Sequence, residues 1–203
     1  MAVKPSVFDE TYNQYLAQIA QVDFKPKEEM LGIQVEGNEI VIPFFGRPYR
    51  VSTKKIINPS GKQPPLSTSV VLCKYLLLCP QVPSLDKEWV SYRDFKDNAP
   101  LIGKFINHIE RPIAQNFTGR FDELTAALGE LGGKNLDLDL SYQLIMKLFP
   151  LPKVPVLLLF DDADDEFSAQ CKVLFERRAD QYLDPECLTI VGMHLADYLK
   201  IEL

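Results

Sequence analysis

The run VPVLLLF at residues 154–160 restricts the fold of this chain more than any other feature of its sequence. Every residue in the run is apolar, so a strand here would bury both of its faces. The run overlaps PLPKVP at residues 150–155, which we interpret as a stiff turn because proline fixes the backbone angle φ. We therefore expect a central strand that pairs antiparallel with the strand before it.

Two other segments have the patterns of strands. In NLDLDLSYQL, residues 135–144, apolar and polar residues alternate strictly, which predicts a strand with one buried face. Residues 31–52 contain three short runs of β-prone residues, separated by turn sequences around Gly37 and Gly46. This second segment therefore predicts an antiparallel meander of three strands.

Helices are predicted over much of the remaining chain. The segment 67–79 is apolar on almost every side, which is typical of a helix in the centre of a core. Gly132-Gly133 is typical of a helix end, and Asp184 followed by Pro185 is typical of a helix start. The predicted helices cover residues 7–22, 67–79, 100–117, 119–131, 164–179 and a last segment from 185.

These elements predict a single α+β domain over residues 1–203, with a mainly antiparallel sheet of about five strands and helices packed on it. The length of 203 residues is within the usual range for one domain.

The net charge of −6 lies in the last quarter of the chain. Residues 1–150 contain 17 acidic and 17 basic side chains, whereas residues 151–203 contain 11 acidic and 5 basic ones. Binding of nucleic acid needs a concentrated basic surface, so we expect no nucleic-acid partner. An unknown protein partner or a small ligand remains open, and so does a homo-oligomer.

Other patterns bear on location and cofactors. No segment approaches the roughly 18 consecutive apolar residues of a membrane helix, which predicts no membrane partner. The start, MAVKPSVFDETY, has neither a long apolar core nor a small-residue cleavage site, so we expect no secretory signal and a cytoplasmic protein. The cysteines form no CxxC pair, and we therefore expect reduced thiols and no bound cofactor. They are Cys73, Cys79, Cys171 and Cys187.

Residues 159–170, LFDDADDEFSAQ, contain five carboxylates within six positions. One interpretation is a site for a divalent cation, with Asp161, Asp162 and Asp165 as oxygen ligands and Glu166 as a base. The other, which we favour, is the acidic first turn of a helix beginning near residue 164, because acids there offset the helix dipole. The sequence leaves both interpretations open.

The segment EWVSYRDF, residues 88–95, is a candidate pocket. Trp89 and Tyr92 offer flat rings on which a ligand can stack, and Arg93 offers a cation for its anionic group. Lys62, in the basic loop NPSGKQPPLS, is a further candidate for the same pocket. The alternative is that these aromatic rings only pack in the core.

Several motifs follow one another in a characteristic order. They are GKxxPLS before an apolar helix ending KYLLLCP, then WVSYRDF, a Gly-Gly turn, LPKVPVLLLFDDADDEFSA and QYLDPECL. With this order, and with landmarks at Pro155, at residues 164–167 and at Trp89, the chain resembles an uncharacterised bacterial and archaeal family, domain of unknown function 3786. The resemblance covers residues 10–200.

The resemblance implies no reaction, because the family has no established activity. Some relatives bear an added cysteine-rich segment of the Fe–S type, which implies a setting in anaerobic redox or corrinoid metabolism. This chain lacks such a segment.

The function is predicted from what these patterns offer. His108 and His194 belong to no metal or catalytic motif. We expect first a non-catalytic cytoplasmic domain that binds a partner or a small ligand, as an accessory of redox enzymes. A structural or oligomerisation module is the second expectation. A hydrolase or transferase that uses a divalent metal at residues 161–166 is the third.

Overall fold

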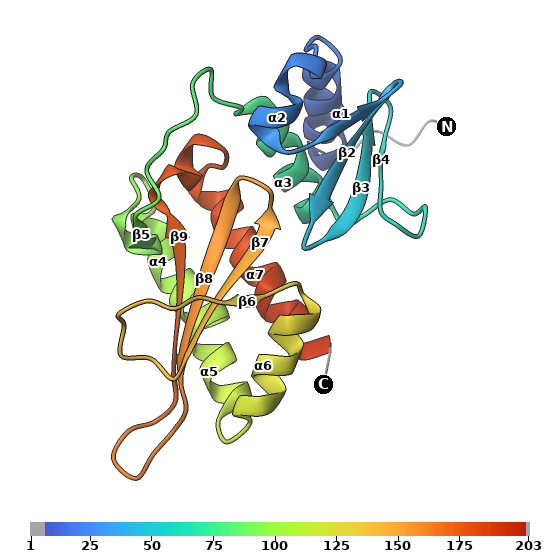
Figure 1. Cartoon of the computed structure of the whole chain (residues 1–203). Helices are drawn as coiled ribbons and strands as arrows, with labels where there is room; N and C mark the ends of the chain where they lie inside the picture. Colours follow the sequence, from blue (N-terminus) through green and yellow to red (C-terminus); the bar gives the residue numbers. More distant parts are fainter. Residues whose placement is uncertain (1–6, 202–203) are drawn as a thin grey trace.

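The computed structural model describes residues 7–201 of the chain, in which helices pack on two antiparallel sheets (Figure 1). The predicted α+β class is confirmed. The strands are divided between two sheets, whereas a single sheet was expected. The first six residues lie outside the described part, so the prediction of a missing secretory signal is not addressed there.

The larger sheet has the strand order β5-β9-β8-β7-β6, and every neighbouring pair in it is antiparallel. The apolar run forms the central strand β8, whose residues are buried on both faces up to Phe160. This confirms the central strand predicted from VPVLLLF, but its partner on one side is Leu144–Leu151 and not the predicted strand 135–144. The strands of the sheet are β5 (Trp89–Ser91), β6 (Lys134–Asn135), β7 (Leu144–Leu151), β8 (Val154–Asp161) and β9 (Gln170–Glu176).

The smaller sheet contains the predicted meander and one added strand. Its turns have left-handed glycines at Gly37 (φ 60°) and Gly46 (φ 72°), a conformation that glycine adopts without steric cost. The fourth strand pairs with β3 through Val51 and Ile56. The strands are β1 (Gln34–Glu36), β2 (Glu39–Phe44), β3 (Arg47–Ser52) and β4 (Ile56–Ile57).

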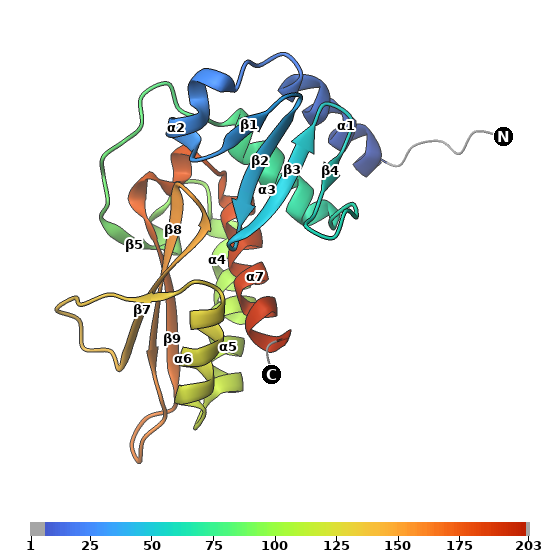
Figure 2. The ribbon, with the colours of Figure 1, turned by 45° about the vertical axis from the view of Figure 1, so that its right-hand side comes forward.

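Two helices cover the smaller sheet, and Figure 2 shows α3 lying between this sheet and α7. The buried side chains of α3 include Leu72 and Tyr75, as its apolar sequence predicts. The helices of this half are α1 (Val7–Ile19) and α3 (Leu66–Leu77), with the short turns η1 (Lys25–Lys27) and α2 (Glu28–Leu31) between α1 and β1.

The predicted helix 100–117 is present, but its middle is a π-helical turn. Pro112 has no N–H to donate to the carbonyl four residues earlier, and its ring would clash with that carbonyl in an α-helix. A wider turn just before the proline avoids this clash. The segment consists of α4 (Ala99–Phe105), η3 (Ile106–Glu110) and α5 (Arg111–Phe117).

The remaining helices pack against the larger sheet and against one another. Gly192, in the middle of α7, lies so close to the α4–η3 segment that an added Cβ would be 2.7 Å from Ile109 Cδ1. The elements are α6 (Phe121–Glu130), α7 (Pro185–Ile201) and the 3-10 turns η2 (Tyr92–Asp94) and η4 (Arg177–Gln181).

The predicted helix 164–179 is wrong. Residues 162–169 form the loop of a β-hairpin, and the next residues form β9. The side chains of Cys171, Val173 and Phe175 are buried on one face, which is the two-residue period of a strand. The central strand β8 also needs a partner on its second edge, and β9 supplies it. The acidic residues therefore begin no helix.

The predicted strand over 135–144 is also largely wrong. Only Lys134 and Asn135 pair with β7, and one further bond joins Leu136 N–H to the Ile145 carbonyl at 3.1 Å. Beyond that point the chain forms an exposed loop, in which Leu140 is 43% exposed. Strict alternation predicts a strand only where a neighbouring strand is present to pair with.

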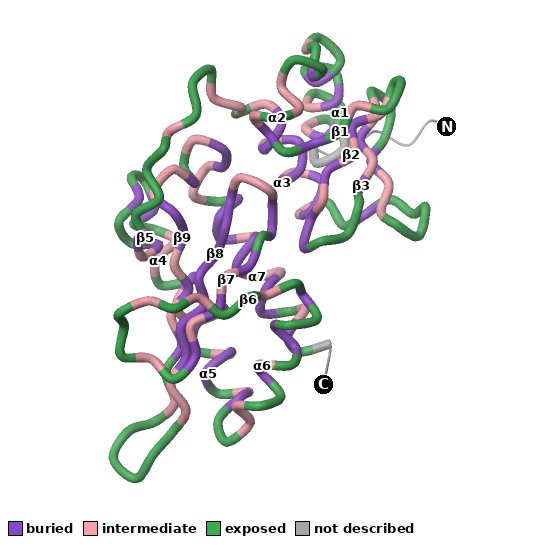
Figure 3. Tube along the Cα trace, viewed as in Figure 1, coloured by how far each residue is buried: buried purple, intermediate pink, exposed green. Residues whose placement is uncertain are grey.

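The buried residues of both sheets form one contiguous cluster, shown as the purple parts of the trace in Figure 3. The sheets are joined directly, because the Phe45 N–H donates to the Pro150 carbonyl at 2.9 Å. Gly32, with φ 64°, packs against Pro152, where an added Cβ would lie 2.5 Å from the proline Cβ. The assignment of residues 1–203 to one domain stays a prediction.

Candidate functional site

A cavity of about 310 Å³ lies at the edge of the larger sheet, between the end of β5 and the π turn. We call it the Arg93 cavity. Three separate segments of the chain contribute to it: η2 with the residue before it, the α4–η3 helix, and β9. It is lined by Ser91, Tyr92, Arg93, Asp94, Ile102, Phe105, Ile106, Glu110 and Lys172.

Tyr92 and Phe105 form a rigid apolar part of the lining. Their rings stack with centroids 4.3 Å apart and an angle of 3° between the planes. The Tyr92 hydroxyl donates to the Pro185 carbonyl at 2.9 Å and accepts from Thr189 Oγ1 at 2.9 Å, which fixes the ring from α7. Burial raises the pKa of Tyr92 above its ordinary value. Tyr92 therefore contributes an uncharged ring to the lining of the cavity.

A capping box positions Arg93. Ser91 ends β5, and its Oγ accepts a hydrogen bond from the Arg93 N–H at 3.3 Å. In return, Asp94 Oδ2 accepts from the Ser91 N–H at 2.9 Å. This reciprocal pair is the usual way to start a helical turn, and it sets the backbone of Arg93 at the mouth of the cavity.

Glu110 is the buried charge of the site, with 8% of its surface exposed. Its Oε1 accepts a hydrogen bond from the Val173 N–H at 3.1 Å, and its Oε2 lies 3.4 Å from Lys172 Nζ. A buried carboxylate is stable only when it is bonded in this way. The pair Glu110–Lys172 is therefore neutral as a unit.

Arg93 is the cation that the cavity leaves available. Within residues 7–201 its guanidinium makes no ion pair or hydrogen bond, and the side chain is exposed. Lys172 is paired with Glu110, and Asp94 is bonded to the backbone of Ser91. The cavity thus presents one free guanidinium beside the apolar surface of Ile102 and Phe105. Such an arrangement can hold a carboxylate that is attached to an apolar body.

Two of the residues predicted for a pocket line this cavity, and two do not. Tyr92 and Arg93 belong to it. Trp89 is half-buried on β5, where the Lys147 ammonium lies 5.1 Å from the centre of its ring. Lys62 is exposed in the loop after β4, with its backbone N–H donating to Asn58 Oδ1 at 2.9 Å. The structure therefore does not bring Trp89 or Lys62 into this lining.

The acidic stretch forms links between loops. Asp161 Oδ1 accepts from the Gln143 N–H at 2.8 Å, which ties β8 to the loop before β7. Asp162 Oδ1 accepts from the N–H groups of Gly119 and Ala163, both at 2.8 Å, and so holds the hairpin loop against the turn between α5 and α6. These two carboxylates serve neighbouring backbone segments.

The rest of the stretch lies in the exposed part of the hairpin loop. Asp164 Oδ1 accepts from the N–H groups of Glu166 and Phe167, and these bonds lower the pKa of Asp164. Asp165 and Glu166 are exposed. In the portion of the chain that the structure describes, no three side chains of His, Cys, Asp or Glu are grouped so that they could hold a metal ion. A cation site at Asp161, Asp162 and Asp165 has no support from this geometry.

Sequence reasoning missed most of the Arg93 cavity. Phe105, Glu110 and Lys172 are far from Arg93 along the chain, and only folding brings them together. One local signal was present for Glu110, because Pro112 in the middle of a predicted helix indicates a disturbed turn just before it. π turns of this kind are frequent at functional sites.

The fold and the cavity define an α+β protein with two antiparallel sheets and a small ligand-sized site at the edge of the larger one. The model of the family described as Domain of unknown function (DUF3786) matches residues 23–198, and the chain belongs to this family. No curated protein matches the chain, and no solved structure matches it. Across residues 7–201, the helices are all too short or too polar to cross a membrane.

Proposed function

We propose that this protein is a non-catalytic binding domain and that the Arg93 cavity takes a small organic acid. The observation that supports this most is the free guanidinium of Arg93 next to an apolar wall, in a cavity whose two acids are both bonded within the protein. A carboxylate of the ligand pairs with Arg93 in the two-pronged manner typical of arginine. The apolar body of the ligand lies on Ile102 and Phe105.

The size of the cavity fits this class of ligand. A volume of about 310 Å³ is at the lower end of the range for small-molecule sites, which is about 300–1,000 Å³. The lining carries two basic and two acidic side chains, so it favours a ligand with a single negative charge over a multiply charged one. We therefore name the class as monocarboxylic acids with a compact apolar group.

Phenylacetate is the probe for this proposal, and isothermal calorimetry measures its binding. Arg93→Met removes the charge from an exposed side chain and should weaken binding about tenfold or more, the usual effect of losing a charge-assisted pair. Lys62→Met is the matched control, since it also removes one exposed positive charge but lies outside the cavity. It should bind phenylacetate as the unaltered protein does.

Two outcomes contradict the proposal: no binding of phenylacetate or of any acid retained through gentle purification, or equal binding by the Arg93→Met variant. Native mass spectrometry of the purified protein checks for a retained acid. A cytoplasmic location and a role beside redox or corrinoid enzymes stay predictions, as does an oligomerisation role.

A further inference from the structure

A second cavity, of about 390 Å³, lies near the junction of the two sheets. We call it the Tyr182 cavity. Its walls come from four segments that are distant in the sequence: η1 and α2, the linker of residues 78–88 between α3 and β5, the β7–β8 turn, and η4 with the residue after it. Figure 1 shows this linker as the long green loop that runs from α3 to β5.

Tyr182 has a buried hydroxyl that is unpaired among the described residues. Its side chain is 0% exposed, and its hydroxyl is without any hydrogen-bond partner in the structure of residues 7–201. Folded proteins leave very few buried polar atoms unpaired, because each one loses its water without compensation. Tyr182 is a lining residue of this cavity, so its covered and unpaired hydroxyl is a group that a ligand can satisfy once the lining moves.

The neighbouring Tyr75, in contrast, has a hydroxyl that is fully hydrogen-bonded within the core. The ring of Tyr75 lies 5.9 Å from that of Tyr182. The Tyr75 hydroxyl donates to the Leu31 carbonyl and accepts from the Lys153 N–H at 3.2 Å. Tyr75 thus joins α2 to the β7–β8 turn, whereas the hydroxyl of Tyr182 joins nothing.

Arg178 is held in place beside this cavity by a buried acid. Its Nε and Nη2 atoms both bond to Glu176 Oε2, at 2.6 and 2.5 Å. Glu176 is 1% exposed and also pairs with Lys147 at 3.3 Å. Among residues 7–201, the Nη1 atom of Arg178 has no hydrogen-bond partner, so its two hydrogens are available to a ligand.

Lys153 adds a second cation to the lining. Its backbone N–H donates to the Tyr75 hydroxyl, and its half-buried side chain has no ion pair with any residue from 7 to 201. Glu29 is the one acidic side chain among the residues that form the lining. Met30, Pro83 and Leu85 supply apolar surface on the same cavity.

We propose that the Tyr182 cavity binds a small organic anion whose charged group is a phosphate or a carboxylate. Its oxygens accept hydrogen bonds from the Tyr182 hydroxyl and from Arg178 Nη1, and they pair with the Lys153 ammonium. Its apolar part lies on Met30 and Leu85. This site is distinct from the Arg93 cavity, with which it shares no lining residue.

Entry requires a small movement of the lining, because the Tyr182 hydroxyl is covered by its neighbours. Two side chains are suited to move. Met30 is unbranched with three rotatable bonds. Leu85 is 85% exposed on the linker, whose neighbouring residue Ser84 is tied to η4 by the bond from its N–H to Gln181 Oε1 at 3.1 Å.

The test uses protein with ¹³C-labelled methionine methyl groups, titrated with phenyl phosphate in one arm and with benzoate in the other. Met30 lines the cavity, whereas Met146 lies on β7 and Met193 on α7, and neither lines it. We expect a saturable shift of the Met30 signal with at least one probe and none at Met146 or Met193. The probe that binds more tightly identifies the charged group. Binding at the Arg93 cavity alone would leave Met30 unmoved.

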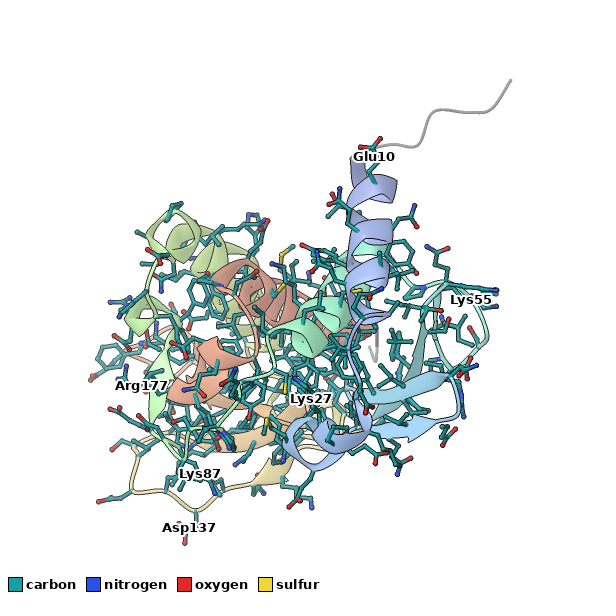
Figure 4. All side chains as sticks on the ribbon, turned by 90° about the horizontal axis from the view of Figure 1, so that it is seen from above. Glu10, Lys27, Lys55, Lys87, Asp137 and Arg177 are labelled. Carbon is teal, nitrogen blue, oxygen red and sulfur yellow. The ribbon has the colours of Figure 1, made fainter. Side chains whose placement is uncertain are left out.

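Three variants complete the test. Tyr182→Phe and Lys153→Met should each weaken binding of the tighter probe about tenfold. Lys55→Met is the control for lost charge, since Figure 4 places Lys55 at the far side of the smaller sheet, away from Arg177 and Lys87. It should leave binding unchanged.

A stability measurement separates a ligand-binding hydroxyl from a structural one. Removing an unpaired buried hydroxyl takes away an uncompensated polar group, so Tyr182→Phe should melt at the same or a higher temperature than the unaltered chain. The proposal is overturned if Met30 responds to neither probe, if Tyr182→Phe binds the tighter probe unchanged, or if this variant melts at a lower temperature.

Discussion

Glu110 and Val173 are joined by a hydrogen bond that replaces a missing strand: the Val173 N–H donates to Glu110 Oε1 at 3.1 Å. On this side of β9 the strand β5 pairs only with residues from Leu174 to Glu176. The next residue along β9, Val173, has no partner on β5 for its buried N–H. The π turn brings the Glu110 carboxylate into place to accept from it. Glu110 also lines the Arg93 cavity.

This contact predicts a difference between two substitutions of Glu110. Glu110→Ala leaves the buried Val173 N–H without an acceptor and should lower the free energy of unfolding by about 2–3 kcal/mol. Glu110→Gln keeps an oxygen acceptor and loses only the pair with the partly exposed Lys172, which is worth about 1 kcal/mol or less. Urea unfolding measures both. Equal losses in the two variants would show that the hydrogen bond to Val173 contributes nothing.

The close approach of α7 to the α4–η3 helix predicts the effect of Gly192→Ala. The added Cβ would lie 2.7 Å from Ile109 Cδ1 and 3.0 Å from Phe105 Cε2, and both side chains are buried. Overpacking of this kind costs about 1–3 kcal/mol, more than the roughly 1 kcal/mol that alanine gains over glycine in a helix. We expect a lower melting temperature in calorimetry.

Gly103→Ala is the matched control for this prediction. Gly103 is also inside a helix, and an added Cβ there would meet nothing within 4 Å. The substitution should raise the free energy of unfolding by about 0.5–1 kcal/mol. If both variants gain stability, the packing of α7 on this helix is looser than the distances indicate.

The sequence predicts the elements of this fold where one local signal dominates. An apolar run that follows a turn predicts β8 in the middle of a sheet, and the helix predicted over residues 100–117 is present as α4, η3 and α5. At β9 two signals conflicted, because acids that resemble a helix start come just before an alternating strand. Residues 170–176 form a strand because β8 needs a second strand to pair with, and the short sequence around β9 does not reveal this need.

The candidate site was less predictable for a related reason. Tyr92 and Arg93 are adjacent in the sequence, so a single segment could suggest them. Glu110 reaches the same cavity from the interrupted helix, and Lys172 reaches it from β9, where the acidic sequence favours a helix. The basic loop around Lys62 favours that residue as a candidate for the same pocket, but charge alone does not indicate which side chains meet in the fold.

The cysteines should differ sharply in reactivity. Cys73, Cys171 and Cys187 are buried, and burial raises the pKa of each thiol, to about 12 for Cys73. The thiolate is the reactive form, so these three should resist alkylation in the folded protein. Cys79 is only partly buried. Iodoacetamide at pH 8, followed by peptide mass spectrometry, should label Cys79 first, and fast labelling of a buried cysteine would contradict this assignment.

His194 should make the stability of the protein depend on pH. Burial lowers the pKa of its imidazole below the ordinary value of 6.5, and its Nε2 shares a hydrogen bond with Thr68 Oγ1 at 3.2 Å. Below pH 6.5 the unfolded chain binds a proton that the folded chain does not. The free energy of unfolding should therefore fall as the pH drops from 6.5 towards the folded-state pKa, by up to about 1.4 kcal/mol per pH unit.

Urea unfolding between pH 7.5 and 5.5 measures this dependence. His194→Gln should flatten it, while His108→Gln, which changes an exposed residue of the π turn, should leave it as it is. The carboxyl groups of Asp184 and Glu28 do not interfere, because their pKa values are lowered and they titrate below this window. An unchanged slope in His194→Gln would assign the dependence to another group.

The acidic hairpin loop yields a prediction that separates its structural residues from its exposed ones. Asp162→Ala removes the acceptor for the N–H groups of Gly119 and Ala163 and should cost about 1 kcal/mol of stability. Asp162→Asn keeps an oxygen in the same place and should cost less. Asp165→Asn changes an exposed side chain and should stay within about 0.5 kcal/mol of the unaltered protein. Calorimetry of the four proteins, with and without Mg²⁺, checks the series. A rise in melting temperature with Mg²⁺ that disappears in Asp165→Asn would instead show that these acids bind a metal ion. An exposed carboxylate affects the melting temperature in this way only when it holds a bound ion.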